Sequence, residues 1–264
     1  MNKKTLNGIL RWFNRYADSF HGPDGKLHPL LQLKLAHSLR VAEDARDMAR
    51  DLGWSDEDVN TAEAIGILHD VGRFSQYAEF KTQSDRHSID HAKRSWEVIE
   101  REKVLSEAGP AEVRRIQDAI LGHNRIEVSA DVSEDSLPFV RLIRDADKLD
   151  IFMLFHDVIA NDKLGEHPEL IFGVPMEGTA NPELLDMIRA QRNAPFSMIK
   201  SLTDFKFIQM SWVYDLHYPP SFERVEQRNV IGKLESLLPP SPEAREVADL
   251  ARGHVARRGR RRAE

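Results

Sequence analysis

An adjacent histidine and aspartate, His69 and Asp70, close an apolar stretch of the chain, and Gly72 follows two residues later. Most helices end with Lys, Arg or Gly at the solvent edge. An imidazole and a carboxylate at that point are instead groups that can hold a metal ion or transfer a proton. A single His-Asp pair is common by chance, so it indicates a site only if other segments bring partners to it.

Four further polar residues fall on otherwise apolar helical faces: His37, His91, His123 and Asp147. One such histidine alone is more often a core residue bonded to a backbone carbonyl. All of these groups together would cost several kcal/mol per charged group to bury without compensation. A shared divalent cation removes that cost, and imidazole and carboxylate ligands suit Fe, Mn, Co, Ni, Zn or Mg.

The composition limits the chemistry available to such a site. The 264 residues include no cysteine, which excludes thiolate zinc sites, iron–sulfur clusters and cysteine nucleophiles. No apolar run approaches the roughly 18 residues that a membrane span needs. Arg11 and Arg15 also interrupt the apolar run that a signal peptide would need. We therefore expect a cytoplasmic protein with no membrane partner.

The net charge of −6 is unevenly distributed. Residues 251–264 carry six arginines and one glutamate, so the rest of the chain has a net charge near −11. That balance argues against a broad nucleic-acid surface on the body of the protein. The basic segment 251–264 is typical of a disordered, solubilising tail.

Apolar residues recur every three or four positions along the chain, which predicts helices, and no segment shows the alternation of a strand. The predicted helices cover about 6–20, 29–52, 55–70, 86–102, 110–122 and 138–158. Gly72 opens a predicted loop to about residue 85, and 124–136 is a second, polar loop. The Gly- and Pro-rich segment 161–181 predicts an irregular lobe. Further short helices follow, the last from Ser221 to Pro239-Pro240.

No repeat or linker divides the chain. We therefore expect one all-α domain over 1–264, with a metal-binding core at about 30–155. The irregular lobe and C-terminal helices occupy about 160–240, and the tail follows. We expect substrate specificity to reside in 73–86, 124–136 and 161–181.

The ordered set of His37, then His69-Asp70, then Asp147 within Ala146-Asp147-Lys148-Leu149 resembles the HD superfamily of metal-dependent phosphohydrolases. His91 and His123 resemble two further histidines of its dinuclear branches. The stretch from His69 to Gln76 is similar to a bacterial HD subgroup with an Arg-Phe-x-Gln continuation. The resemblance covers about residues 30–155 and implies an HD-type helical bundle with additional C-terminal helices.

The resemblance implies one or two divalent metal ions, of unknown identity. One ion would be held by His37, His69, Asp70 and Asp147. Asp70 would bridge to a second ion held by His91 and His123.

The implied reaction is hydrolysis of a phosphate ester by a metal-activated water, with Asp70 essential. Arg73 and Lys148 are the best candidates to bind the substrate and stabilise negative charge on the phosphate, followed by Gln76 and Arg125. His123, if it is not a ligand, could protonate the leaving oxygen.

The substrate would be a nucleotide or another small phosphorylated metabolite. The sequence does not distinguish a phosphate monoester from a diester as the substrate, and it leaves open whether the protein forms a homo-oligomer. Two other functions also stay open: a dinuclear iron oxygenase of the HD type, and a non-catalytic module that senses a nucleotide.

Overall fold

The computed structural model describes residues 1–161, 175 and 178–259, and every regular element among them is a helix. This confirms the predicted all-α class. The contacts divide the chain into two compact units, Met1–Asp147 and Lys148–Glu264. The single domain expected from the sequence stays a prediction. Within the part of the chain that the structure describes, no helix is both long and apolar enough to cross a bilayer.

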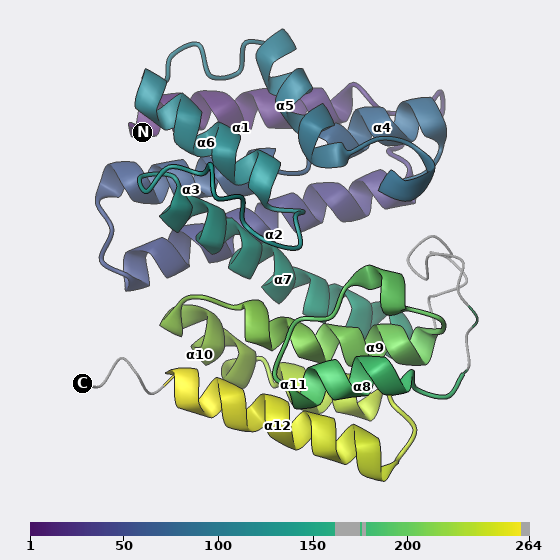
Figure 1. Ribbon diagram of the computed structural model, residues 1–264. Helices are drawn as coiled ribbons and strands as arrows, with labels where there is room; N and C mark the ends of the chain where they lie inside the picture. Colours follow the sequence, from purple (N-terminus) through teal and green to yellow (C-terminus); the bar gives the residue numbers. More distant parts are fainter. Residues whose placement is uncertain (162–174, 176–177, 260–264) are drawn as a thin grey trace. The chain divides into compact units, whose positions relative to one another are not determined.

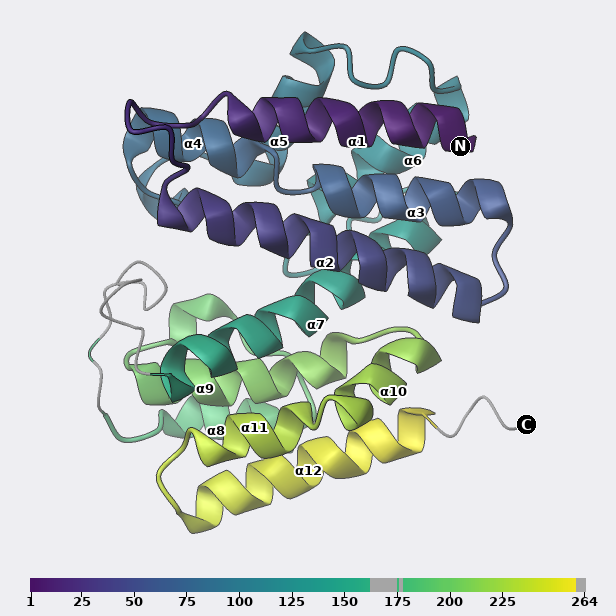
Figure 2. The same ribbon diagram turned by 180° about the vertical axis from the view of Figure 1, so that it is seen from behind.

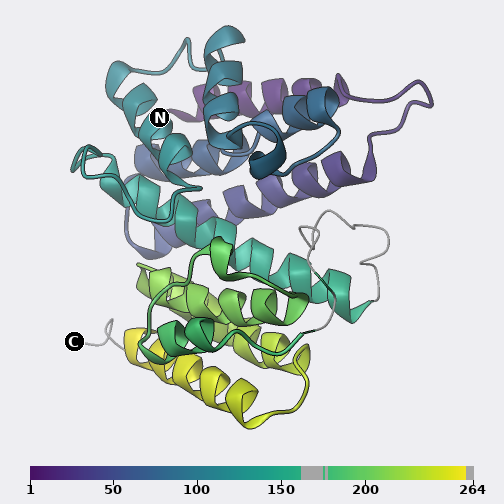
Figure 3. The ribbon, with the colours of Figure 1, turned by 45° about the vertical axis from the view of Figure 1, so that its right-hand side comes forward.

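The first unit is built from six helices and the start of a seventh (Figures 1 and 2). Their bounds are α1 Lys3–Asp18, α2 Pro29–Asp51, α3 Asp56–Leu68, α4 Gly72–Phe80, α5 His91–Arg101, α6 Pro110–Gly122 and α7 Leu137–Ala160. Helix α3 lies at the centre, where it packs against α1, α2 and α6, and α4 packs against α5 (Figure 3). The central position explains why α3 is apolar on most of its surface.

Two glycines allow close approach where the His-Asp pair is positioned. A Cβ atom on Gly66 of α3 would lie 2.5 Å from the Cα atom of Ala42 on α2. A Cβ atom on Gly72 would lie 2.5 Å from the backbone nitrogen of Ser95 on α5. Both contacts are shorter than a side chain allows, so the absence of a Cβ atom sets how near α2 and α5 come to the end of α3.

Helix starts in this unit follow the expected chemistry. Ser55 caps α3 by accepting a hydrogen bond from the backbone of Asp58, which agrees with the predicted start of this helix near residue 55. Asp90 caps α5, because its side chain accepts hydrogen bonds from the backbone nitrogens of Ala92 and Lys93. The prediction that α5 begins near residue 86 was therefore wrong, because the helix begins at His91.

The predicted loop from Gly72 to residue 85 was also wrong, because Gly72–Phe80 is helix α4. Gly72 was interpreted as a helix breaker, but it serves the close contact with α5, and Phe74 is buried. The short 3₁₀ turn Asp85–His87 follows.

The second unit contains the rest of α7 and α8 Pro182–Arg189, α9 Leu202–Ser211, α10 Pro219–Gln227, α11 Val230–Ser236 and α12 Pro242–Gly259. Helix α12 packs against α8, α9, α10 and α11. Part of the core is a cluster of Phe155, Val158, Leu202 and Phe205. The single helix predicted from Ser221 to Pro239 is in fact α10 and α11, which meet at Asn229, a residue in the left-handed conformation.

The prediction that residues 251–264 form a disordered tail was wrong as far as Gly259, because residues 251–259 belong to helix α12. Ala244, Val247, Ala248, Ala251 and Val255 are spaced by three or four and are buried, so the helix continues to Gly259. Residues 260–264 and most of the predicted lobe at 161–181 lie outside the described residues.

Candidate metal centre

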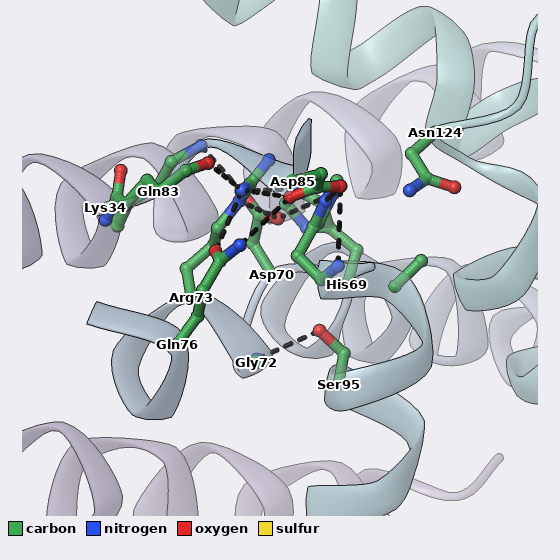
Figure 4. Close-up of polar contacts among 12 residues, drawn as sticks. Lys34, His69, Asp70, Gly72, Arg73, Gln76, Gln83, Asp85, Ser95 and Asn124 are labelled. Carbon is green, nitrogen blue, oxygen red and sulfur yellow. Dashed lines mark hydrogen bonds and ion pairs between the residues drawn. The ribbon is translucent and has the colours of Figure 1, made fainter. Parts of the chain in front are cut away.

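The six predicted metal ligands come together in the structure from five different helices or their ends. His37 lies on α2, His69 and Asp70 follow α3, His91 opens α5, His123 follows α6, and Asp147 lies on α7. Except for Asp147, which is about one-sixth exposed, these side chains are almost fully buried. Figure 4 shows His69 and Asp70 among the surrounding polar side chains.

One set of contacts gathers around the Oδ2 atom of Asp70. The Nε2 atoms of His37 and His69 each lie 3.6 Å from this oxygen. The two Nε2 atoms are 3.3 Å apart. The Nε2 atom of His37 also lies 3.1 Å from Oδ1 of Asp147. These four residues are the set that the family resemblance assigns to the first metal ion.

A second set gathers around the other carboxylate oxygen of Asp70. Its Oδ1 atom lies 3.4 Å from Nε2 of His91 and 3.9 Å from Nε2 of His123. The two histidine nitrogens are 3.0 Å apart. Asp70 therefore presents one oxygen to each pair of histidines, as a bridging ligand would.

The Oδ1 atom of Asp70 provides a test of whether a cation fits here. It is buried and has no hydrogen-bond partner among the residues that the structure describes. Buried carboxylate oxygens without a partner are rare, because the desolvation cost is not repaid. Two histidine nitrogens and a carboxylate oxygen are ligand types that first-row divalent ions accept. The donor set therefore fits a metal ion.

Three of the histidines have the orientation that metal binding requires. The Nδ1–H groups of His69 and His123 donate to the carbonyls of Gly66 at 2.8 Å and Ile120 at 2.6 Å. The Nδ1 atom of His91 lies 2.5 Å from Oδ2 of Asp85. With Nδ1 engaged in this way, each ring turns Nε2 and its lone pair toward the cluster.

The electrostatics favour the same protonation states. Burial, with the nearby Arg73, lowers the pKa of His91 to about 4. Burial and the nearby His69 lower the pKa of His123 to about 4 as well. Burial alone would raise the pKa of Asp70, but Lys34 and the surrounding cationic groups hold it well below its usual range. Neutral imidazoles and ionised carboxylates are the forms that bind cations.

Two residues of the site were not found from the sequence. The Nζ atom of Lys34 lies 2.7 Å from Oδ2 of Asp70. Its position one turn before His37 on α2 is a signal that could have placed it on the same helical face. Asp85 orients His91. It lies in a short turn, and turns have no periodic sequence pattern from which its position could be predicted.

Arg73, one of the predicted substrate residues, lies beside the cluster. Its Nε atom is 3.6 Å from Oδ1 of Asp70. Its Nη1 atom donates to Asp85 Oδ1 at 2.7 Å and to Gln76 Oε1 at 2.9 Å, and it also bonds the carbonyl of Gln83 (Figure 4). Arg73 thus ties α4 to the 3₁₀ turn.

Gln76, another predicted substrate residue, has its polar atoms engaged within the chain, and its contact with substrate stays a prediction. Its side chain is fully buried, and its Nε2 atom lies within hydrogen-bond distance of Asp85, Ser88 and the carbonyl of Ile89. Because every polar atom of the amide has a partner within the chain, the structure gives Gln76 a positioning role.

Arg125 and Lys148, the other predicted substrate residues, form ion pairs elsewhere. Arg125 Nη2 donates to Asp90 Oδ2 at 2.6 Å and so joins the end of α6 to the start of α5. Lys148 Nζ lies 2.8 Å from Asp215 Oδ2 in the second unit. Their contact with substrate stays a prediction.

Arg144 holds the segment that follows His123. This buried side chain on α7 donates to the carbonyls of Gly122 at 3.3 Å and Ile126 at 3.1 Å, and it also bonds the carbonyl of Arg125. It therefore supplies donors to the carboxyl end of α6, where helix carbonyls lack intrahelical partners.

Comparison with known proteins gives one match. Residues 35–151 match the family model of the HD domain, a segment that contains all six predicted ligands. No curated protein and no solved structure matches the chain.

Proposed function

We propose that this chain is a metal-dependent phosphohydrolase that acts on a small phosphate ester, because residues 35–151 match the family model of the HD domain. The observation that carries the proposal is the position of Asp70 between two pairs of histidines. Each pair faces a different oxygen of the same carboxylate, and one of these oxygens is buried with no hydrogen bond to any described residue.

We propose that the centre holds one or two divalent ions. His37, His69, Asp70 and Asp147 would hold the first, and Asp70 would share its second oxygen with His91 and His123 to hold the other. The complete set of ligands argues against a purely ligand-sensing module, because burial of so many unused ligand groups would destabilise the fold.

Bound divalent ions would lower the pKa of water and polarise the phosphoryl group. Side chains of the protein would supply the other groups that the reaction needs. Arg73 places a permanent positive charge beside Asp70, where it can oppose the negative charge that develops on the phosphate. The low pKa of His123 makes its ring neutral at pH 7, which suits a metal ligand better than a proton donor.

We propose a nucleotide or another small phosphorylated metabolite as the substrate. Lys34 and Arg73 flank Asp70, so an anionic group that approaches the cluster meets two cations. A phosphate is the metabolite group that best matches both these cations and a divalent centre.

The test is a screen for phosphate release over nucleotides, sugar phosphates and a chromogenic phosphodiester, with the metal-free protein supplied with Mn²⁺, Mg²⁺, Fe²⁺, Co²⁺, Ni²⁺ or Zn²⁺. We expect release that depends on one of these ions and is lost when a chelator removes it. Comparable release from metal-free protein would contradict the proposal.

The same preparation separates the two other functions. Oxygen consumption by the iron-loaded protein, with no release of phosphate, would identify an oxygenase instead. Retention of a nucleotide without turnover would identify a sensing module.

A further inference from the structure

Lys34 makes an ion pair with the residue at the centre of the cluster. It lies on α2 one turn before His37, and its Nζ atom is 2.7 Å from Oδ2 of Asp70. Only about one-sixth of its side chain is exposed. Among the residues that the structure describes, Asp70 is the hydrogen-bond partner of this ammonium group.

The same oxygen also faces the first pair of histidines. The Nε2 atoms of His37 and His69 lie 3.6 Å from Oδ2 of Asp70. A divalent ion held by these histidines would therefore bind the same carboxylate oxygen of Asp70 that is paired with Lys34. Two cations that share one carboxylate oxygen weaken each other's binding, because their mutual repulsion is strong at short range.

Arg73, the other cation beside Asp70, is held in place differently. Its guanidinium is bonded to Asp85, Gln76 and the carbonyl of Gln83, which together fix its position. Lys34 has a flexible four-carbon stem and, among the described residues, one hydrogen-bond partner, so it can turn to another anion when that partner is taken.

We propose that Lys34 is a substrate-binding residue: it neutralises Asp70 in the metal-free protein and binds a phosphoryl oxygen of the substrate once a divalent ion has engaged Asp70. This inference rests on the proposed function, because it requires a divalent ion and a phosphate ester at the same centre. It adds a residue that lies outside the segment matched to the HD family model.

The proposal predicts opposite effects on two binding equilibria. Removal of the positive charge by Lys34→Met relieves competition for Asp70, so Mn²⁺ should bind about tenfold more tightly. The Mn²⁺-loaded variant lacks a charge-assisted hydrogen bond to phosphate, so inorganic phosphate should bind about tenfold to a hundredfold more weakly. A purely structural role for Lys34 would weaken both.

The experiment is calorimetric titration of metal-free protein with Mn²⁺, and of Mn²⁺-saturated protein with inorganic phosphate. Lys34→Gln provides a second neutral variant, and Lys34→Arg keeps the charge and should keep most of the phosphate affinity. Lys93→Met is the matched control, because Lys93 is an exposed lysine at the start of α5. Circular dichroism checks that each variant is folded.

Tighter Mn²⁺ binding together with weaker phosphate binding in both neutral variants supports the inference. Unchanged phosphate affinity in a folded neutral variant overturns it and leaves the proposed function intact. If the wild-type protein binds neither Mn²⁺ nor another divalent ion, the proposed function itself fails, and the role of Lys34 fails with it.

Discussion

Asp85 holds His91 from the side opposite the candidate metal ligands, with its Oδ2 atom 2.5 Å from Nδ1 of the imidazole. The other oxygen of Asp85 accepts hydrogen bonds from Arg73 and Gln76. The ring therefore has one nitrogen fixed by a carboxylate and the other directed at Asp70. Such carboxylate–histidine pairs set both the tautomer and the orientation of metal-binding histidines.

The first prediction concerns this pair. Asp85→Ala should lower the affinity for a divalent ion by about tenfold to a hundredfold, because His91 loses the group that orients it. Calorimetric titration with Mn²⁺ measures the effect. Asp131→Ala, which removes an exposed carboxylate in the loop before α7, serves as the control. Equal affinities in the two variants would show that Asp85 does not position His91.

The second prediction concerns the spacing of α2 and α3. Gly66→Ala places a methyl group 2.5 Å from Cα of Ala42, so the two helices must move apart. We expect a loss of about 1–3 kcal/mol in the free energy of unfolding. Weaker Mn²⁺ binding should accompany it, because His37 and His69 are positioned by these two helices.

Chemical denaturation of Gly66→Ala measures that loss. Gly8→Ala on α1 is the matched control, because nothing lies within 4 Å of a Cβ atom at Gly8. Alanine is the better helix former, so the control should be neutral or slightly stabilised. A Gly66→Ala protein as stable as this control would contradict the packing described for α2 and α3.

The third prediction concerns Arg144, whose guanidinium bonds the carbonyls that follow α6. Arg144→Met leaves several of these groups without a charged donor and should reduce the free energy of unfolding by about 2–4 kcal/mol. Urea denaturation tests this against Arg141→Met, an exposed arginine on the same helix. If both variants lose the same stability, the buried contacts of Arg144 contribute little.

The fourth prediction concerns pH and the second unit. Burial, together with Arg258 and Arg257, lowers the pKa of His254 to about 4. The folded protein therefore binds fewer protons than the unfolded chain between about pH 4 and an ordinary histidine pKa near 6.5. Protonation of His254 therefore disfavours the folded state. This cost is absent above about pH 6.5, and it lowers the free energy of unfolding as the pH falls toward 4.

His254→Gln should remove that part of the acid sensitivity. The free energy of unfolding of the variant should fall less between pH 7 and pH 5 than that of the wild-type protein. His21→Gln, at an exposed histidine of the first unit, is the control and should follow the wild type. An acid-induced loss in His254→Gln as large as in the wild type would exclude this origin.

Much of the fold could be predicted because it depends on local patterns. Spacing by three or four residues identified α1, α2, α3, α6 and α7, and Ser55 identified where α3 begins. Helix α4 was missed because a glycine often interrupts a helix. Gly72 instead allows close packing against α5. Helix α12 was missed as a whole, because the arginines near its end obscured the buried face that includes Ala251 and Val255.

The residues of the candidate site also divide into those that could be predicted from the sequence and those that could not. His37, His91, His123 and Asp147 could be found because each is a polar residue on an apolar helical face. Lys34 and Asp85 were not found. The helical spacing places Lys34 on the same face as His37, but its contact with Asp70, like that of Asp85 with His91, arises only when the elements pack together. Gln76 was predicted to bind substrate because it is a donor close to the His-Asp pair; its burial and its partners suit a positioning role, and its contact with substrate stays a prediction.

The most direct test of the central claim is the number of divalent ions bound per chain, measured by elemental analysis after dialysis of metal-free protein against Mn²⁺. Asp70→Ala is compared with Asp157→Ala, which alters an exposed His-Asp pair at His156-Asp157 on α7. We predict one or two ions in the wild type and in Asp157→Ala, and neither bound metal nor phosphate release in Asp70→Ala. Full metal content and activity in Asp70→Ala would contradict the account.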